Sequence, residues 1–444
     1  MKINWPDPLR LTSMIGALFL SLTAPSLAQE AMSVNAAIKT ALHNNPAFQS
    51  LDMGVAIARL ELDKAKAGRL PTLDLRGGYT RYSDPMIVVP IHQTGVFPAL
   101  DKDIFSGGLY AQMPLYAGGR LTASNAMARA KIEGTQQRKE IMKQDLIFSV
   151  MQFYSELLII EKLQQASDQR LSFYTKEKDR IALLLEKGKA TRLDQAKINT
   201  QLENARLARL QLDMSYDQNA VMLASLMSAE LPTSTTLQGF SVAPNALPAS
   251  LDVALDITRR EHPALLEAKT QMDVASSKMK IAKAAKRPQV SAVGNARSMA
   301  GSALVAQNEW QVGVQLSVPL FDGKIRKKSV QQARLGQTQS RLALKNLINQ
   351  TKANTITAWQ SMAVAKNSVH VSKTALEQAS EALRIETLRY ENERSTVNDL
   401  TLAEAAFWDA SSALVRAENL YELSKAQLLR TMGVLNAASI QPAA

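Results

Sequence analysis

The sequence has 444 residues, a formal net charge of +12 and no cysteine. The absence of cysteine excludes disulfides, thiolate zinc sites, a cysteine nucleophile and a lipid-anchored N-terminal cysteine. The four histidines are scattered without metal-ligand spacing, and the chain has neither a glycine-rich phosphate loop nor a nucleophile beside a base, so we expect no cofactor, no metal and no enzyme activity. Lys and Arg are interleaved with Glu and Asp along predicted helices. We interpret them as a solvated face or an attraction for anionic lipid or cargo, and expect no nucleic acid as partner.

Residues 1–28 are predicted to be a secretory signal peptide. Lys2 and Arg10 precede the apolar run LTSMIGALFLSL, and SLA at 26–28 supplies small residues for cleavage. The alternative is a membrane anchor, but the run is too short and too lightly apolar to span a bilayer. No later segment approaches ~18 consecutive apolar residues. The chain is therefore expected in the periplasm, outside the cell or in the outer membrane.

Two copies of one pattern follow, a first repeat over 29–231 and a second repeat over 251–436. Matching residues lie 217 positions apart at first and 205 positions apart later: Pro46 and Pro263, Pro71 and Pro288, then Pro114 and Pro319, Asp194 and Asp399, Tyr216 and Tyr421, Met227 and Met432. A linker over 232–250 joins the repeats, and residues 437–444 form a C-terminal tail. An ordered match of this length indicates that the chain contains two structural repeats of one architecture.

Each repeat opens with two short helices, and Pro46 or Pro263 begins the second one, since proline suits the first helical position. Two strands per repeat follow, each of about ten residues, the length that crosses a bilayer at a tilt. They are predicted over about 72–83, 104–115, 289–298 and 308–319. The last alternates most clearly, with Gln311, Gly313 and Gln315 on one face and a predicted lipid-facing set on the other: Trp310, Val312, Val314 and Leu316. A half-buried strand of a soluble sandwich is the alternative.

The first repeat carries an insertion of 12 residues within 84–103, the difference between the two offsets. We expect it to be a long external loop between the two strands. Its apolar residues could instead fold inward as a lid or pack against a neighbouring protomer.

Long helices complete each repeat, over about 121–185 and 191–231 in the first and about 324–390 and 396–433 in the second. They contain no proline, and their apolar residues follow a heptad pattern typical of helices packed side by side. Each repeat therefore holds two long antiparallel helices joined by a tip. Four strands are too few to close a membrane barrel, and an open edge in lipid leaves backbone groups unsatisfied, so the strands require a shared, symmetric assembly.

With its export signal, twofold strand pairs, and PLYAGGR or PLFDGK before a long helix, the chain resembles the TolC family of outer-membrane efflux proteins over residues 30–436. The resemblance implies a mainly α fold with a β-barrel portion, assembled as a homotrimer. Twelve strands, four per protomer, would form one barrel in the lipid of the outer membrane of a Gram-negative bacterium. The helices would form a tunnel across the periplasm.

The resemblance also implies a function as a passive exit duct for efflux or type I secretion. The partners would be a periplasmic adaptor (membrane fusion) protein and an inner-membrane pump or ABC transporter. We weigh two alternatives. A periplasmic adaptor would have one hairpin flanked by lipoyl-like halves, and a secreted coiled-coil pore-forming protein would not need the repeated strands.

The candidate functional residues lie at the hairpin tips. Thr191-x-x-Asp194 and Thr396-x-x-Asp399 are each typical of a capping box that opens the returning helix. The resemblance implies that Asp194, Asp399 and Tyr390 form a periplasmic gate, in which rings of carboxylates would favour cations. Capping alone is the alternative, and both roles could coexist.

The tips depart from the family pattern in three places. Leu402 stands where the family often has a second aspartate, and the gate arginine falls at Ser395, with Arg394 one position earlier as the substitute candidate. Glu393 replaces the glycine that the first tip keeps. We therefore expect rewired closing links. The residues expected to contact the adaptor, or else to be ordinary solvated loop residues, are Lys187, Gly188, Lys189, Glu391 and Glu393.

Overall fold

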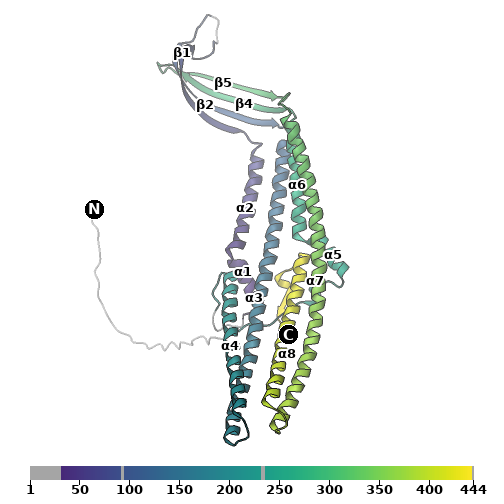
Figure 1. Ribbon diagram of the computed structural model, residues 1–444. Coiled ribbons are helices and arrows are strands. Elements are labelled where there is room, and N and C mark those ends of the chain that lie inside the picture. The colour runs from purple at the N-terminus through teal and green to yellow at the C-terminus, as the bar shows by residue number, and fades with distance from the viewer. Residues whose placement is uncertain (1–31, 92–94, 232–235, 443–444) are drawn as a thin grey trace, which may run out of the picture.

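A computed structural model describes residues 32–91, 95–231 and 236–442 (Figure 1). The expected signal peptide, 1–28, lies outside the described residues. Two short helices, two strands and two long helices follow one another in each half of the chain. In the first half they are α1 (Val34–Asn44), α2 (Pro46–Ala67), β1 (Thr72–Ile87), β2 (Leu100–Tyr116), α3 (Arg120–Glu186) and α4 (Arg192–Met227). In the second half they are α5 (Leu251–Glu261), α6 (Pro263–Ala284), β4 (Gln289–Ala300), β5 (Gln307–Ser317), α7 (Ile325–Glu391) and α8 (Val397–Met432).

The helices α2 and α6 each begin with a proline, and the side chain of the residue before that proline caps the helix. Oδ1 of Asn45 accepts a hydrogen bond from the backbone N–H of Phe48 at 3.1 Å at the start of α2. At the start of α6, Nδ1 of His262 accepts one from the N–H of Ala264 at 3.2 Å. Burial lowers the pKa of His262, which keeps the ring neutral and its Nδ1 available as an acceptor.

The strands of the first half are longer than expected. β1 runs to Ile87 and β2 starts at Leu100, so much of the insertion over 84–103 extends the two strands instead of forming a loop. Pairing of Ile87 with Leu100 accounts for the extension. In the connection between the strands, Val88 is buried and Phe97 is exposed.

Within the predicted linker, 232–250, and the predicted tail, 437–444, two short described segments pair with each other. β3 (Phe240–Val242) and β6 (Ile440–Pro442) form a small antiparallel sheet beside the turns η1 (Pro244–Ala246) and η2 (Ala437–Ser439). Asn35 on α1 donates a hydrogen bond from Nδ2 to the carbonyl oxygen of Ile440 at 3.1 Å. Strands of three residues are too short to leave a periodic signal in the sequence.

The main buried core lies where this small sheet meets α1, α3, α4 and α8. Tyr154 on α3 is fully buried, and its hydroxyl donates toward the carbonyl oxygens of Met32, at 2.6 Å, and Gln238, at 2.8 Å. Those two residues belong to the segments before α1 and before β3. The core therefore fastens the start, the middle and the end of the described chain to one long helix.

One end of the molecule is a four-stranded antiparallel sheet in the order β1-β2-β4-β5, and the opposite end holds the two hairpin tips (Figure 1). The sheet is open in the single chain, and its edge strands β1 and β5 have no described partner on their outer sides. Among the described residues, none of the helices combines the length and the apolarity needed to cross a membrane.

The prolines at the strand exits have a structural reason. Pro114 lies within β2 and pairs with Ser291 of β4, but the pairing of β2 with β1 ends earlier, at Gln112. Because proline has no N–H to donate, it is tolerated where a strand has lost its neighbour on one side. Pro319 lies two residues beyond the end of β5.

Candidate functional site at the hairpin tips

Both tips reverse the chain with the same backbone geometry. In the first tip Gly188 has φ +71°, and in the second Glu393, 205 positions later, has φ +55°. The next residue in each loop donates its N–H back to the preceding helix, Lys189 to Leu184 and Arg394 to Arg389, both at 2.8 Å. Glycine adopts the left-handed region without steric cost, whereas a side chain at this φ is strained. The second tip therefore keeps a strained glutamate in place of glycine.

The side chain of Glu393 contacts the other tip. Nζ of Lys189 lies 2.8 Å from Oε1 of Glu393, so an ion pair joins the α3–α4 tip to the α7–α8 tip within one chain. The pair raises the pKa of Lys189 and lowers the pKa of Glu393, and both side chains are exposed to solvent.

Asp194 and Asp399 both close capping boxes. Oδ2 of Asp194 accepts from the hydroxyl and the N–H of Thr191, at 2.7 and 3.0 Å, while the N–H of Asp194 donates to Oγ1 of Thr191 at 3.1 Å. Asp399 and Thr396 repeat the arrangement at 2.7, 3.2 and 3.2 Å. Hydrogen bonds from the threonines hold the pKa of both carboxyls below the ordinary value. The two aspartates are therefore ionised helix caps.

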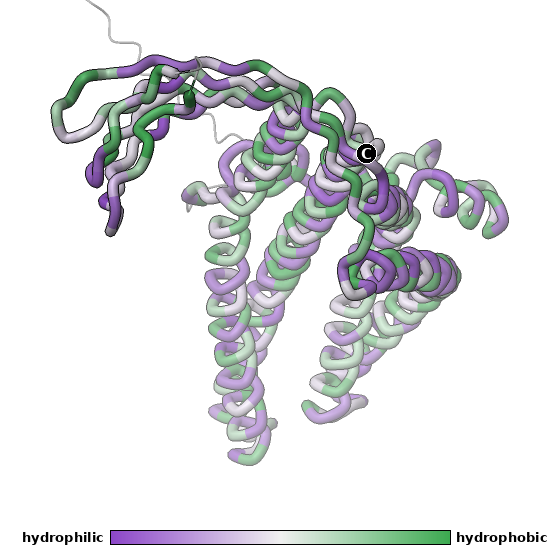
Figure 2. The backbone as a smooth tube through the Cα atoms, turned by 90° about the horizontal axis from the view of Figure 1, so that it is seen from above, coloured by the Kyte–Doolittle hydropathy of each residue, from purple (hydrophilic) through white to green (hydrophobic). Residues whose placement is uncertain are grey.

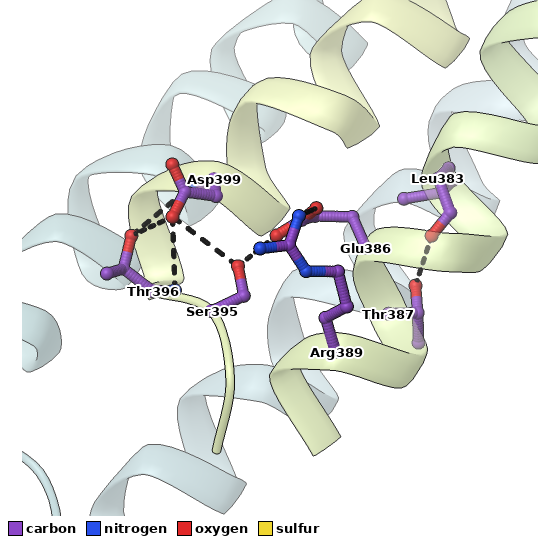
Figure 3. Close-up of polar contacts among 7 residues, drawn as sticks. All are labelled: Leu383, Glu386, Thr387, Arg389, Ser395, Thr396 and Asp399. Atoms are coloured by element: carbon purple, nitrogen blue, oxygen red, sulfur yellow. Dashed lines mark hydrogen bonds and ion pairs between the residues drawn. The ribbon is translucent and has the colours of Figure 1, made fainter. Parts of the chain in front are cut away.

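Ser395, at the position of the family's gate arginine, connects the two helices of the second tip (Figure 3). Its hydroxyl contacts Glu386 in the last turns of α7 and lies 3.4 Å from Oδ2 of Asp399 at the start of α8. Arg389 approaches the same glutamate, with 3.4 Å between Nη1 and Oε2. Arg394 is exposed and forms no ion pair with any described residue, so it lies outside this network.

Tyr390 packs against the first hairpin. Its ring is buried in the cluster at the tips, and the guanidinium of Arg180 lies 4.8 Å from the ring centre. Burial, with the nearby charges of Glu177 and Asp194, raises the pKa of Tyr390, while Arg180 opposes this. Tyr390 and Asp194 are therefore neighbours across the two tips, whereas Asp399 belongs to the network of Ser395.

A buried polar cluster above the tips was not predicted. The hydroxyl of Tyr174 on α3 donates to Oε2 of Glu404 on α8 at 2.5 Å, and Nε of Arg170 lies 3.3 Å from Oε1 of the same glutamate. Glu404 is only 5% exposed, and burial raises its pKa, although Tyr174 and Arg170 oppose the shift. Burial is also the main reason that the pKa of Tyr174 rises to about 12. The signal in the sequence was an acidic residue four positions after the buried Leu400, on the apolar stripe of α8.

The tips also carry the residues that we expected to meet an adaptor. Lys187, Gly188 and Lys189 are exposed in the first tip, and Glu391 and Glu393 are exposed in the second. Among the described residues, no group of His, Asp or Glu side chains is arranged to hold a metal ion.

At the opposite end, the strand register gathers the predicted lipid-facing residues on one side of the sheet. Trp310 pairs with Ala296, which pairs with Leu109, which pairs with Leu75, so these four residues share a face. The same face continues through the exposed side chains of Leu73, Met113, Val312, Val314 and Leu316. Figure 2 shows hydrophobic and hydrophilic residues alternating along the curved strands.

The other side of the sheet is polar. It carries Gln311 and the ion pair between Arg297 and Glu309, with 2.6 Å between Nη2 and Oε2. The guanidinium of Arg76 lies over the ring of Tyr110 on this side, 4.9 Å from its centre. A sheet with one mainly apolar and one charged face is suited to separate lipid from water.

The model of the family described as outer membrane efflux protein matches residues 37–229 and 254–434. The alkaline protease secretion protein AprF of Pseudomonas aeruginosa is 24% identical over 442 residues, which cover 97% of this chain and 90% of AprF. The outer membrane protein TolC of Vibrio cholerae is 22% identical over 457 residues, covering 97% of this chain and 95% of TolC.

Solved structures have the same fold. A crystal structure of CusC superimposes with a TM-score of 0.78 at 18% identity, covering 96% of this chain and 98% of CusC. VceC from Vibrio cholerae superimposes with a TM-score of 0.74 at 18% identity, covering 90% of this chain and 96% of VceC.

Proposed function

Because the chain belongs to the outer membrane efflux protein family, we propose that it forms the outer-membrane exit duct of an efflux or type I secretion system. The family places it at the outer membrane of a Gram-negative bacterium, and it is a family of efflux proteins rather than enzymes. Transport through the duct is passive, and an inner-membrane pump or ABC transporter supplies the energy. The chain is similar, over nearly the full length of both chains, to a protein named for protease secretion. This similarity supports type I secretion as one of the two possible functions of the duct.

The observation that carries the proposal is the open sheet with its continuous apolar face. β1 and β5 each leave one edge without a described partner, and the apolar face from Leu75 to Trp310 is exposed in the single chain. In lipid, an unpaired edge costs several kcal/mol for each unsatisfied backbone group, so β5 of one protomer must pair with β1 of the next. Three copies bring twelve strands together, which is within the size range of outer-membrane barrels. A homotrimer closes this arrangement with cyclic symmetry.

The long helices then form the wall of a periplasmic tunnel, and the tips form its gate. Asp194 and Asp399 each cap a helix and, in three copies, would present rings of carboxylate at the narrow end. Their lowered pKa values keep these rings charged, which favours cations in the constriction. Tyr390 holds the second hairpin against the first through Arg180. Ser395 takes the place of the missing arginine by bridging Glu386 and Asp399, and Arg394 forms no ion pair with any described residue.

The exposed loop residues are the surface for a periplasmic adaptor. Lys189 and Glu393 neutralise each other, so the exposed charges left for an adaptor are Glu186, Lys187 and Arg192 on the first tip and Glu391 and Arg394 on the second. The first tip therefore carries one more positive charge, which gives the two tips different electrostatic characters. An adaptor with a complementary charge distribution would distinguish the two tips and bind them in a fixed order.

The experiment that tests the duct is the protein mass of the particle extracted from membranes in detergent, with the detergent contribution subtracted. We expect three chains per particle, recovered from the outer-membrane fraction. A single chain per particle, or recovery from the soluble periplasmic fraction alone, would overturn the shared barrel and with it the proposed duct.

A further inference from the structure

The chain passes between sheet and helices at four crossings, all at the same end of the sheet. The crossings run from α2 to β1, from β2 to α3, from α6 to β4 and from β5 to α7. Pairing of Thr72 with Gln112 and of Gln289 with Ser317 places all four at one level (Figure 1). If the sheet is embedded in the outer membrane, as proposed above, this level is its periplasmic boundary.

Basic residues concentrate at these crossings. From 283 to 288 the chain carries three Lys or Arg and no acid, and from 318 to 328 it carries four and a single acid, Asp322. Asp322 is already paired with Arg326, with 3.3 Å between Oδ2 and Nε. Six other exposed basic residues, which we call the basic collar, form no ion pair with any described residue: Arg120, Lys283, Lys286, Lys324, Lys327 and Lys328.

The charge on α7 is one-sided over a long distance. Between Asp322 and Glu377 the sequence contains ten Lys or Arg and no Asp or Glu. Solvated helices ordinarily mix the two signs, because opposite charges three or four positions apart stabilise the helix. The start of α7 forgoes that stabilisation, so its charge is available to an anionic partner.

An apolar stripe leads directly into the collar. Alternate residues of β5 and of the segment that follows it are exposed and apolar, from Trp310 and Val312 to Val318 and Leu320. Leu320 is 91% and Phe321 is 85% exposed, four and three positions before Lys324. Exposed aromatic and aliphatic side chains followed at once by lysines are typical of the boundary between hydrocarbon and headgroups.

We propose that the basic collar binds the headgroups of anionic phospholipids at the periplasmic boundary of the barrel. This inference rests on the proposed function, since it requires the sheet to lie in a bilayer. The lysines of the collar meet the phosphates, while Leu320 and Phe321 insert among the acyl chains. The second repeat provides most of the collar, because the corresponding start of α3 has Arg120 alone in its first turns. Each protomer would therefore hold anionic lipid mainly beside β5 and α7.

The test is a titration of the detergent-solubilised full-length protein with phosphatidylglycerol, and separately with zwitterionic phosphatidylcholine, read by native mass spectrometry. We expect tighter binding of phosphatidylglycerol. The K324Q/K327Q/K328Q variant should lose this preference by up to about fivefold per charge removed, since each Lys near an anionic surface contributes about this factor. Binding of phosphatidylcholine should not change.

A matched control removes three exposed lysines from the same helix at least about 36 Å further along it, at ~1.5 Å per residue. This variant, K352Q/K366Q/K373Q, should keep the preference for phosphatidylglycerol. Equal binding of the two lipids, or an unchanged preference in K324Q/K327Q/K328Q, would overturn the inference. If the collar lined the lumen instead, K324Q/K327Q/K328Q would keep the preference for phosphatidylglycerol and would have an altered ion selectivity in a planar bilayer. The same spectra report the number of chains: trimers without lipid preference refute only the collar, whereas monomers refute the duct.

Discussion

Lys189 and Glu393 form an ion pair between two loops that lie 204 positions apart in the sequence, with 2.8 Å between Nζ and Oε1. The backbone of Glu393 is in the left-handed region that glycine occupies in the first tip. The chain therefore accepts a strained residue at the point where its side chain can hold the two hairpins together. If the tips form the gate, this pair is one of its closing links.

Removing either charge of this pair should open the tips. We expect Glu393→Gln and Lys189→Gln each to raise the single-channel conductance in a planar bilayer at low salt, and K189E/E393K to restore it. At ~1 M salt the difference from the natural protein should shrink, because the Debye length falls from about 10 Å at ~0.1 M to about 3 Å. Glu391→Gln, in the same tip but without an ion pair, is the control. If all four variants had the same conductance as the natural protein, the pair would be incidental to gating.

The two capping aspartates allow charge and capping to be separated. Asparagine can still accept the threonine N–H but carries no charge, whereas alanine loses both. If carboxylate rings line the constriction, D194N/D399N and D194A/D399A should both weaken cation block. Loss of a cap should cost about 1 kcal/mol in Thr191→Ala, measured by thermal unfolding, with Thr191→Ser close to the natural protein. Unchanged cation block in D194N/D399N would leave capping as the sole role of the aspartates.

The buried cluster around Glu404 should make stability depend on pH. Burial raises its pKa, so the folded chain retains a proton that the unfolded chain releases above the ordinary glutamate pKa of about 4.3. A group that holds its proton more tightly when folded makes the folded state less stable as pH rises from that value through the raised one. We expect this loss in melting temperature to be smaller in Glu404→Gln. Glu418→Gln, at an exposed glutamate of the same helix, should keep it.

Tyr174→Phe tests the same cluster from its other side. The hydroxyl donates a short hydrogen bond to a buried carboxylate, so its removal should lower the free energy of unfolding by about 1.5–3 kcal/mol. Tyr216→Phe, at a half-buried tyrosine of α4, provides a comparison at a less buried hydroxyl. A loss below ~0.5 kcal/mol in Tyr174→Phe would show that water replaces the hydroxyl at no cost.

The two faces of β5 should respond differently to arginine. Trp310→Arg or Val314→Arg places a charge on the apolar face, at a cost of about 2–4 kcal/mol per protomer near the membrane midplane. We expect loss of assembled protein from the outer-membrane fraction. Gln311→Arg, one position away on the polar face, should assemble normally. Normal assembly of Val314→Arg would contradict the lipid-facing assignment.

The sequence predicts the local features of this molecule better than its long-range contacts. Thr-x-x-Asp at 191–194 and 396–399 predicts two capping boxes, because both partners lie within one helical turn. The order of short helices, strands and long helices also follows from periodicity and proline. The contact between Lys189 and Glu393 could not be predicted, since it depends on how two hairpins pack, and neither residue carries a local signal for the other. Glu404 did carry a local signal, because it is a charged residue on a buried apolar stripe, but nothing in the sequence identified Tyr174 as its partner.

Some of the other differences between the predicted and the observed elements arise because a segment is short or occurs in one repeat only. β3 and β6 have three residues each, too few for an alternating pattern, and only their pairing reveals them. The insertion after β1 looked like a loop because no second copy exists to align with it. The pairing of the two strands, rather than their composition, extends β1 into the insertion as far as Ile87 and lets β2 begin within it at Leu100.

The pairing of β3 with β6 also links the folding of distant parts of the chain. Ile440 is buried and pairs with Val242, and its carbonyl oxygen accepts a hydrogen bond from Asn35, 405 positions earlier in the sequence. The junction of α1, β3 and β6 can therefore be completed only once residues 440–442 are free to fold onto it. A truncation before residue 440, or an insertion beside it, would disturb the packing of α1 as well as that of β6.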